Sequence, residues 1–78
     1  MNQTQTEEDK KFYIKYLEMA IEDLKEFFTT YDGKYKNHPT INNSRELKNY
    51  YYELQKYSND ISVPQQLMRE IEKKLKLN

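Results

Sequence analysis

Few side chains in this 78-residue chain could do covalent or metal chemistry. There is one histidine, His38, and no cysteine, so the chain offers neither a Cys–His pair nor the usual ligand set of a zinc site. His38 lies in a polar segment directly before Pro39, where we expect an exposed side chain. The one glycine excludes a glycine-rich phosphate loop. These counts predict a protein that is not an enzyme and has no cofactor, metal ion or small-molecule substrate.

One group of carboxylates has the outline of a metal site. Glu22, Asp23 and Glu26 lie within about one turn of a predicted helix. Di-iron bundles combine such carboxylates with paired Glu-x-x-His segments, which this chain lacks. We therefore expect these three side chains to form a solvated helix face.

Aromatic side chains point to binding instead. The chain has eight tyrosines, and a tyrosine ring supplies apolar contact area together with a polar hydroxyl. Tyr50, Tyr51 and Tyr52 are consecutive, so their directions on a helix differ by about 100° and they cannot all face one core. Tyr52 should project away from the core, near Lys48 and Lys56. The expected contact residues for a partner protein are Tyr13, Tyr16, Phe27, Tyr51 and Tyr52, followed by Phe12 and Met19.

A DNA-binding regulator is the alternative hypothesis. Residues 54–71 have the outline of a helix-turn-helix, and residues 34–78 carry a net charge of +4. The side chains that would read base edges are Gln65, Gln66, Arg69 and Lys73. The pattern departs from the motif because Asn or Asp replaces the turn glycine and Leu67 falls one position late. Protein binding therefore remains the first hypothesis.

A long helix must position most of the aromatic residues. Apolar residues recur at alternating spacings of three and four, which places them on one helix face: Ile14, Leu17, Ile21, Leu24, Phe28 and Tyr31. We predict a helix over residues 7–31, capped by Thr6 and ended by Asp32-Gly33, where glycine can take a left-handed conformation. Residues 1–5 have no apolar anchor and should be disordered.

Two shorter helices should follow. After a loop over residues 32–43, Asn43 or Ser44 can begin a helix over residues 44–58, with Glu46 at capping-box distance. Ser62 with Gln65 predicts the start of a third helix, over residues 63–77. Strand patterns are missing from the sequence. We predict a single all-α domain over residues 1–78, a three-helix bundle with a long N-terminal helix and a shorter C-terminal helical hairpin.

The predicted lengths do not match. The first helix should be roughly 37 Å long and the other two roughly 22 Å each. Part of the apolar face of the first helix therefore needs to be covered by something other than these two helices. Either the loop folds back, with Tyr35 and Ile41 closing the end, or a second copy or another protein completes the bundle.

The composition suggests a cellular location and a type of source genome. The chain has no cysteine, no apolar run of the roughly 18–20 residues that span a membrane and no signal-peptide plan at its N-terminus, so we expect a cytoplasmic protein without membrane contact. Frequent Lys, Asn and Tyr are typical of AT-rich genomes, which favours a low-GC bacterium, phage or mobile element. The leading hypothesis is a small protein–protein interaction module such as an inhibitor, immunity protein, antitoxin or adaptor. A structural homo-oligomer, most simply a homodimer, is the second alternative.

Overall fold

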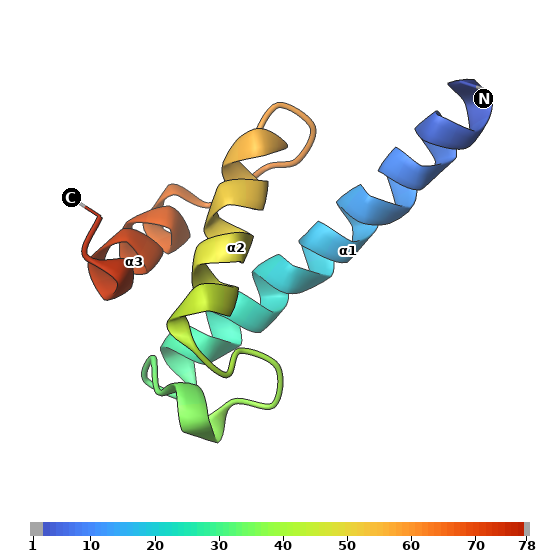
Figure 1. The fold of residues 1–78 in the computed structure, drawn as a ribbon. Helices are drawn as coiled ribbons and strands as arrows, with labels where there is room; N and C mark the ends of the chain where they lie inside the picture. The colour runs from blue at the N-terminus through green and yellow to red at the C-terminus, as the bar shows by residue number, and fades with distance from the viewer. Residues whose placement is uncertain (1–2, 78) are drawn as a thin grey trace.

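Helices make up the fold of this chain (Figure 1). The structure is a computed structural model and describes residues 3–77. Its elements are α1 (Gln3–Thr29), the short 3-10 helix η1 (Tyr35–Asn37), α2 (Ser44–Lys56) and α3 (Gln65–Leu75), and no strand occurs among the described residues. α2 and α3 pack against each other and both contact α1. The predicted all-α three-helix bundle with a long N-terminal helix is confirmed.

The predicted apolar face of α1, which runs from Ile14 to Phe28, forms one wall of the core. Leu17 and Leu24 are fully buried, Ile21 is 6% exposed, and Ile14 and Phe28 lie partly buried at the edges. The other helices and the connecting segments supply the opposite walls through Ile41, Leu47, Leu54, Ile61, Leu67 and Ile71. Burying these branched side chains away from water is the main force that holds the helices together.

The bounds of α1 differ from the predicted range of residues 7–31. The helix begins at Gln3, so it includes residues 3–5, for which disorder was predicted, and Thr6 lies inside it instead of capping it. Residues 1 and 2 lie outside the described part of the chain. At the other end α1 stops at Thr29, and Gly33 takes the predicted left-handed conformation with φ of 68°. The Gly33 N–H donates to the carbonyl oxygen of Phe27 at 2.8 Å and closes the helix end.

The starts of the two later helices had different outcomes. Asn43, one of the two predicted starts, is the N-cap of α2, and its side chain accepts a hydrogen bond from the Glu46 N–H at 3.0 Å. The prediction of Ser62 as the cap of the third helix is wrong. α3 begins at Gln65, and the residue before it, Pro64, is extended and has no side-chain group that could make a capping bond. Ile61, just before Ser62, is buried in the core. Both α2 and α3 are shorter than the predicted ranges 44–58 and 63–77.

The two ends of α1 are covered differently (Figure 1). At its C-terminal end the segment 32–43 folds back, placing the Tyr35 ring centroid 5.3 Å from that of Phe27 and burying Ile41 completely. At its N-terminal end α1 projects beyond α2 and α3, and residues 7–12 are exposed. Folding back therefore covers one end of the long helix and leaves the other open. None of the helices in residues 3–77 has the length and apolar character needed to cross a membrane.

Candidate functional site

The five predicted contact residues do not form one surface. Phe27 is 0% exposed, because the segment after α1 lies over it, and Tyr51 is 6% exposed. The Tyr51 hydroxyl donates to Glu72 Oε2 at 2.8 Å and accepts from Gln55 Nε2 at 3.2 Å, which satisfies it inside the fold. Predicting Phe27 and Tyr51 as contact residues was therefore wrong. Both are core residues.

Tyr52 is exposed but stands alone. Its side chain is 48% exposed, and Lys48 Nζ lies 5.9 Å from the centre of its ring, as the sequence predicted. Lys56 lies over Tyr57 instead, at 5.5 Å. Tyr52 follows Tyr50 by two residues, a rotation of about 200° around α2, so it faces away from the α1 side of the helix. It does not join Tyr13 and Tyr16 in one site.

The N-terminal half of α1 carries exposed apolar side chains on one face. Phe12 is 72% exposed, Tyr16 49% and Met19 67%. Successive members lie four and three residues apart, so they follow one another along the helix. We call these three residues the α1 stripe. A continuous row of exposed large apolar side chains is a feature of binding surfaces.

Acidic residues lie at both ends of the α1 stripe. Glu8 and Asp9 are one helical turn before Phe12, and Glu22 and Asp23 are one turn after Met19. Lys10, Lys11 and Lys15 lie between these acidic residues in the sequence, but only Lys15, three residues after Phe12 and four before Met19, shares the face of the stripe. Residues 1–33 as a whole carry four lysines against eight acids, a net charge of −4. The stripe is therefore an apolar row in a negative field.

Tyrosines from α1 and α2 stack beside this stripe. The Tyr13 and Tyr16 rings are 5.7 Å apart at 20°, and the Tyr16 and Tyr50 rings are 6.4 Å apart at 29°. The Tyr13 hydroxyl donates to the Glu53 carboxylate, and the Tyr16 hydroxyl donates to that of Tyr50 at 3.3 Å. Tyr57 meets Tyr13 edge-on at 5.3 Å. The tyrosine cluster thus joins the two helices where α1 leaves the bundle.

Burial and nearby carboxylates keep these hydroxyls protonated. The pKa of Tyr13 is raised above its ordinary value, first by burial and then by its hydrogen bond to Glu53. The pKa of Tyr50 is also raised, by burial, by the bond from Tyr16 and by the charges of Asp23 and Glu46. Both rings therefore remain neutral hydrogen-bonding groups at neutral pH.

A cavity of about 160 Å³ opens in this cluster between α1 and α2. It is lined by Tyr13, Tyr16, Leu17, Glu46, Asn49, Tyr50 and Glu53. Tyrosine side chains and carboxylates thus line one small space. The arrangement can accept a group that is both flat and positively charged.

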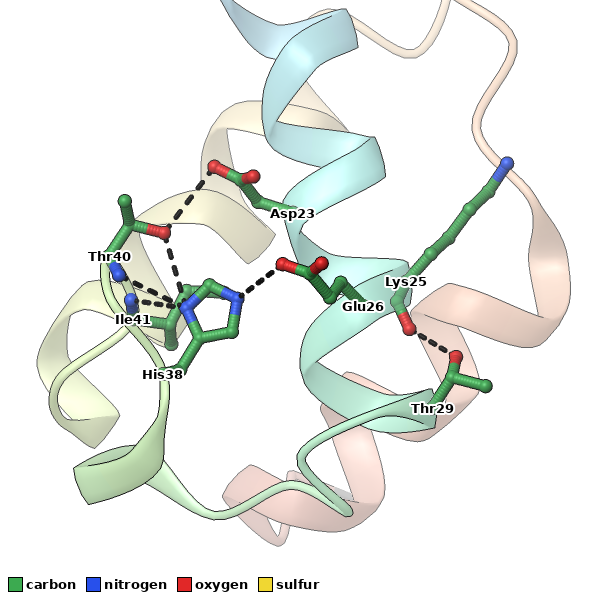
Figure 2. Close-up of polar contacts among 7 residues, drawn as sticks. All are labelled: Asp23, Lys25, Glu26, Thr29, His38, Thr40 and Ile41. Atoms are coloured by element: carbon green, nitrogen blue, oxygen red, sulfur yellow. Dashed lines mark hydrogen bonds and ion pairs between the residues drawn. The ribbon is translucent and has the colours of Figure 1, made fainter.

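His38 is buried, and the expectation of an exposed side chain was wrong (Figure 2). Only 3% of the residue is exposed, because the ring sits edge-on to Phe27 and Tyr31 at centroid distances of 5.7 and 4.8 Å. Its Nδ1 accepts from the backbone N–H groups of Thr40 at 3.1 Å and Ile41 at 3.0 Å. Nδ1 can accept these bonds only without a proton, so the neutral ring carries its hydrogen on Nε2.

Two of the clustered carboxylates on α1 face the same loop (Figure 2). Glu26 Oε1 lies 3.6 Å from His38 Nε2, which is beyond hydrogen-bond range. It lies on the side of the ring whose nitrogen carries the hydrogen. Asp23 Oδ2 accepts from the Thr40 hydroxyl at 3.4 Å. Within residues 3–77, no group of three or more His, Asp or Glu side chains is arranged to hold a metal ion. Asp23 and Glu26 therefore help to position the loop that packs on α1.

The residues of the DNA-binding alternative lie together on one exposed face of α3: Gln65, Gln66, Arg69 and Lys73. Their setting differs from a helix-turn-helix. The connection between α2 and α3 runs over residues 57–64, whereas the motif has a turn of three or four residues. The same helix also carries Glu70, whose Oε1 accepts from Gln66 at 3.4 Å. A carboxylate in this position opposes the approach of a phosphate backbone.

Comparison with protein-family models, with curated proteins and with solved structures finds no match. Sequence reasoning missed Glu46, Tyr50 and Glu53 as site residues. Their spacing of four and three residues places them on one face of α2, and this periodicity was the signal that could have found them.

Proposed function

We propose that this protein is a small, non-enzymatic interaction module that binds a basic, amphipathic segment of another protein on the α1 stripe. The observation that carries the proposal is the exposure of Phe12, Tyr16 and Met19 on a helix whose opposite face is packed in the core. Fully burying one such side chain contributes about 1.5–3 kcal/mol. A partner that covers the stripe therefore gains substantially from contact.

The charge around the stripe supports a basic partner. Acidic residues stand at both of its ends, Glu8 and Asp9 before it and Glu22 and Asp23 after it. A second copy of this chain, packed through the stripe, would bring acidic residues together in either orientation. In a parallel pair each acidic end of the stripe meets the same end of the other copy. In an antiparallel pair the two different ends meet, and both are acidic. Lysine or arginine beside apolar residues on the partner would complement both features of this surface.

The single histidine is consistent with a binding role. His38 Nδ1 is occupied by two backbone N–H groups, so it is not free to act as a base.

An inhibitor, immunity protein, antitoxin or adaptor would use a surface such as the α1 stripe. We propose the cytoplasm of a low-GC bacterium, or a phage or mobile element carried by one, as its setting.

A pair of designed peptides tests the proposal. One is a helix with leucines on one face and lysines on the other, and the second replaces every lysine with glutamate. Their binding to the isotope-labelled protein is followed by NMR. We expect the lysine peptide to shift the amide signals of the α1 stripe, and the glutamate peptide to bind at least about tenfold more weakly.

A double variant on α1 and a control variant on α2 complete the test. Replacing Phe12 and Met19 together with Ser should abolish binding of the lysine peptide, because both side chains are exposed and their loss leaves the core intact. Tyr52→Ser removes an exposed ring on α2, outside the stripe, and should keep the affinity. Equal binding of the two peptides, or equal loss in both variants, would contradict the proposal. A free protein that is a dimer through the α1 stripe would also overturn it.

A further inference from the structure

We infer that the cavity between α1 and α2 is a seat for the guanidinium group of an arginine in the partner's basic segment. The inference rests on the proposed function for the identity of the partner. The preference of the cavity for a cation is a property of the free protein and can be measured without one. Tyr16 belongs both to the α1 stripe and to the cavity wall, so a segment lying on the stripe passes the cavity mouth.

Tyrosine rings line one part of the seat. Tyr13 and Tyr16 are nearly parallel, at 20°, and Tyr16 and Tyr50 are close to parallel, at 29°. The face of a tyrosine ring attracts a cation, and a guanidinium group, being planar, can also stack on it. Hydrogen bonds donated by the hydroxyls hold the rings in position. Tyr13 donates to the Glu53 carboxylate and Tyr16 donates to the Tyr50 hydroxyl. The seat is thus preformed and needs little ordering on binding.

Carboxylates form the other part. Glu46 and Glu53 reach the cavity from α2, and the described residues that line it include no lysine or arginine. Glu53 is already bonded to Tyr13, while the cap of α2 uses only the backbone N–H of Glu46. We therefore assign Glu46 as the carboxylate that pairs with the guanidinium. The pKa of Tyr50 at this wall is raised mainly by burial and by the hydrogen bond from Tyr16, and the charges of Asp23 and Glu46 add to that rise.

The size of the cavity fits one such group. Its volume of about 160 Å³ greatly exceeds the roughly 10–15 Å³ that a single water requires by the same kind of measure. A guanidinium group on its flexible stem can enter, and its N–H groups can reach a carboxylate while its face lies on a ring. An ammonium group lacks the flat face and should bind more weakly.

The test is an NMR titration of the free, full-length protein with N-acetyl-arginine amide. N-acetyl-citrulline amide is the control, because it has the same shape without the charge. We expect saturable shifts of the Tyr13, Tyr16 and Tyr50 ring signals with the arginine compound, with Kd on the order of 10 mM, and none with the citrulline compound. The lysine analogue should bind more weakly than the arginine compound.

Two charge-matched variants locate the site. Glu46→Gln removes the proposed pairing carboxylate and should weaken arginine binding about fivefold. Glu18→Gln removes the same charge from an exposed position of α1 outside the cavity and should leave the affinity unchanged. Equal shifts with citrulline, equal weakening in both variants, or shifts that map away from the three tyrosines would overturn the inference.

The outcome also separates this inference from the proposed function. A protein that binds the lysine peptide on the α1 stripe but shows no response to the arginine compound has the binding surface without the seat. A protein that binds the arginine compound and ignores the peptide has the seat, while the proposed use of the stripe fails. The Phe12 and Met19 double variant should retain the arginine response, because neither residue lines the cavity.

Discussion

Replacing His38 with alanine should destabilise the protein more than any change of an exposed residue. The ring lies edge-on to Phe27 and Tyr31, and its Nδ1 accepts from the N–H groups of Thr40 and Ile41 (Figure 2). Alanine removes the acceptor and most of the apolar contact together. The segment that closes the C-terminal end of α1 then loses its internal anchor.

The size of the effect follows from the burial of these groups. A buried backbone N–H left without an acceptor costs about 1–3 kcal/mol, and this applies to Ile41, which is fully buried. The bond from the Thr40 N–H is only part-buried, so losing its acceptor should cost less than at Ile41. The space left by the ring adds about 1–2 kcal/mol. We expect a loss of about 3 kcal/mol in the free energy of unfolding, a large share of the roughly 4–12 kcal/mol typical for a chain of this size.

Urea unfolding followed by circular dichroism measures this loss. His38→Asn keeps an oxygen acceptor that can bond the N–H groups two and three residues ahead, so it should recover about half of the stability. Lys36→Ala changes an exposed side chain in the same segment and should stay within about 0.5 kcal/mol of the parent. Hydrogen exchange at the Ile41 amide should quicken in the alanine variant and less so in the asparagine variant.

Two results would refute this reasoning. If His38→Ala is as stable as Lys36→Ala, the buried ring and its bonds do not stabilise the fold. If His38→Leu restores full stability while His38→Asn does not, packing alone matters and the acceptor role of Nδ1 is wrong.

Two further predictions concern the core and a helix end. The pKa of Tyr51 is raised by its hydrogen bond to Glu72 and by burial, so its stabilisation is complete below the ordinary tyrosine value of about 10 and is lost as the pH rises above it. Tyr51→Phe should lose about 1 kcal/mol at pH 7 and make the alkaline decline less steep, and an unchanged decline in urea unfolding would contradict this assignment. Gly33→Ala should lose about 1–2 kcal/mol in the same assay, because φ at Gly33 is 68°. Gly33→Asn should lose less, and equal losses would show that backbone conformation is not the cause.

Much of the fold could be predicted because it depends on local sequence. The spacing of Leu17, Ile21 and Leu24 predicted the buried face of α1, and Asn43 predicted the start of α2. Such signals act within one or two helical turns, so they need no knowledge of distant residues. The Ser62 cap was not borne out: α3 begins only at Gln65, and Ile61 next to Ser62 is buried in the core, a tertiary contact that local sequence does not specify.

The candidate site was only partly predictable. Tyr13 and Tyr16 were found from composition and spacing, but their partners Glu46, Tyr50 and Glu53 come from another helix. A cavity between two helices depends on how they cross, which residue spacing on either helix does not specify. For the same reason the sequence did not separate exposed tyrosines from buried ones.

The two phenylalanines Phe12 and Phe27 show what each level determined. That both lie on one long helix could be predicted from the sequence, because helical periodicity and end signals are local properties. Their exposure depends on tertiary packing, which leaves Phe27 fully buried and Phe12 72% exposed. The two residues differ because residues 32–43 fold back over the C-terminal end of α1, while its N-terminal end projects beyond α2 and α3 (Figure 1). Residues with the same chemistry thus became core at one end of the helix and a candidate binding surface at the other.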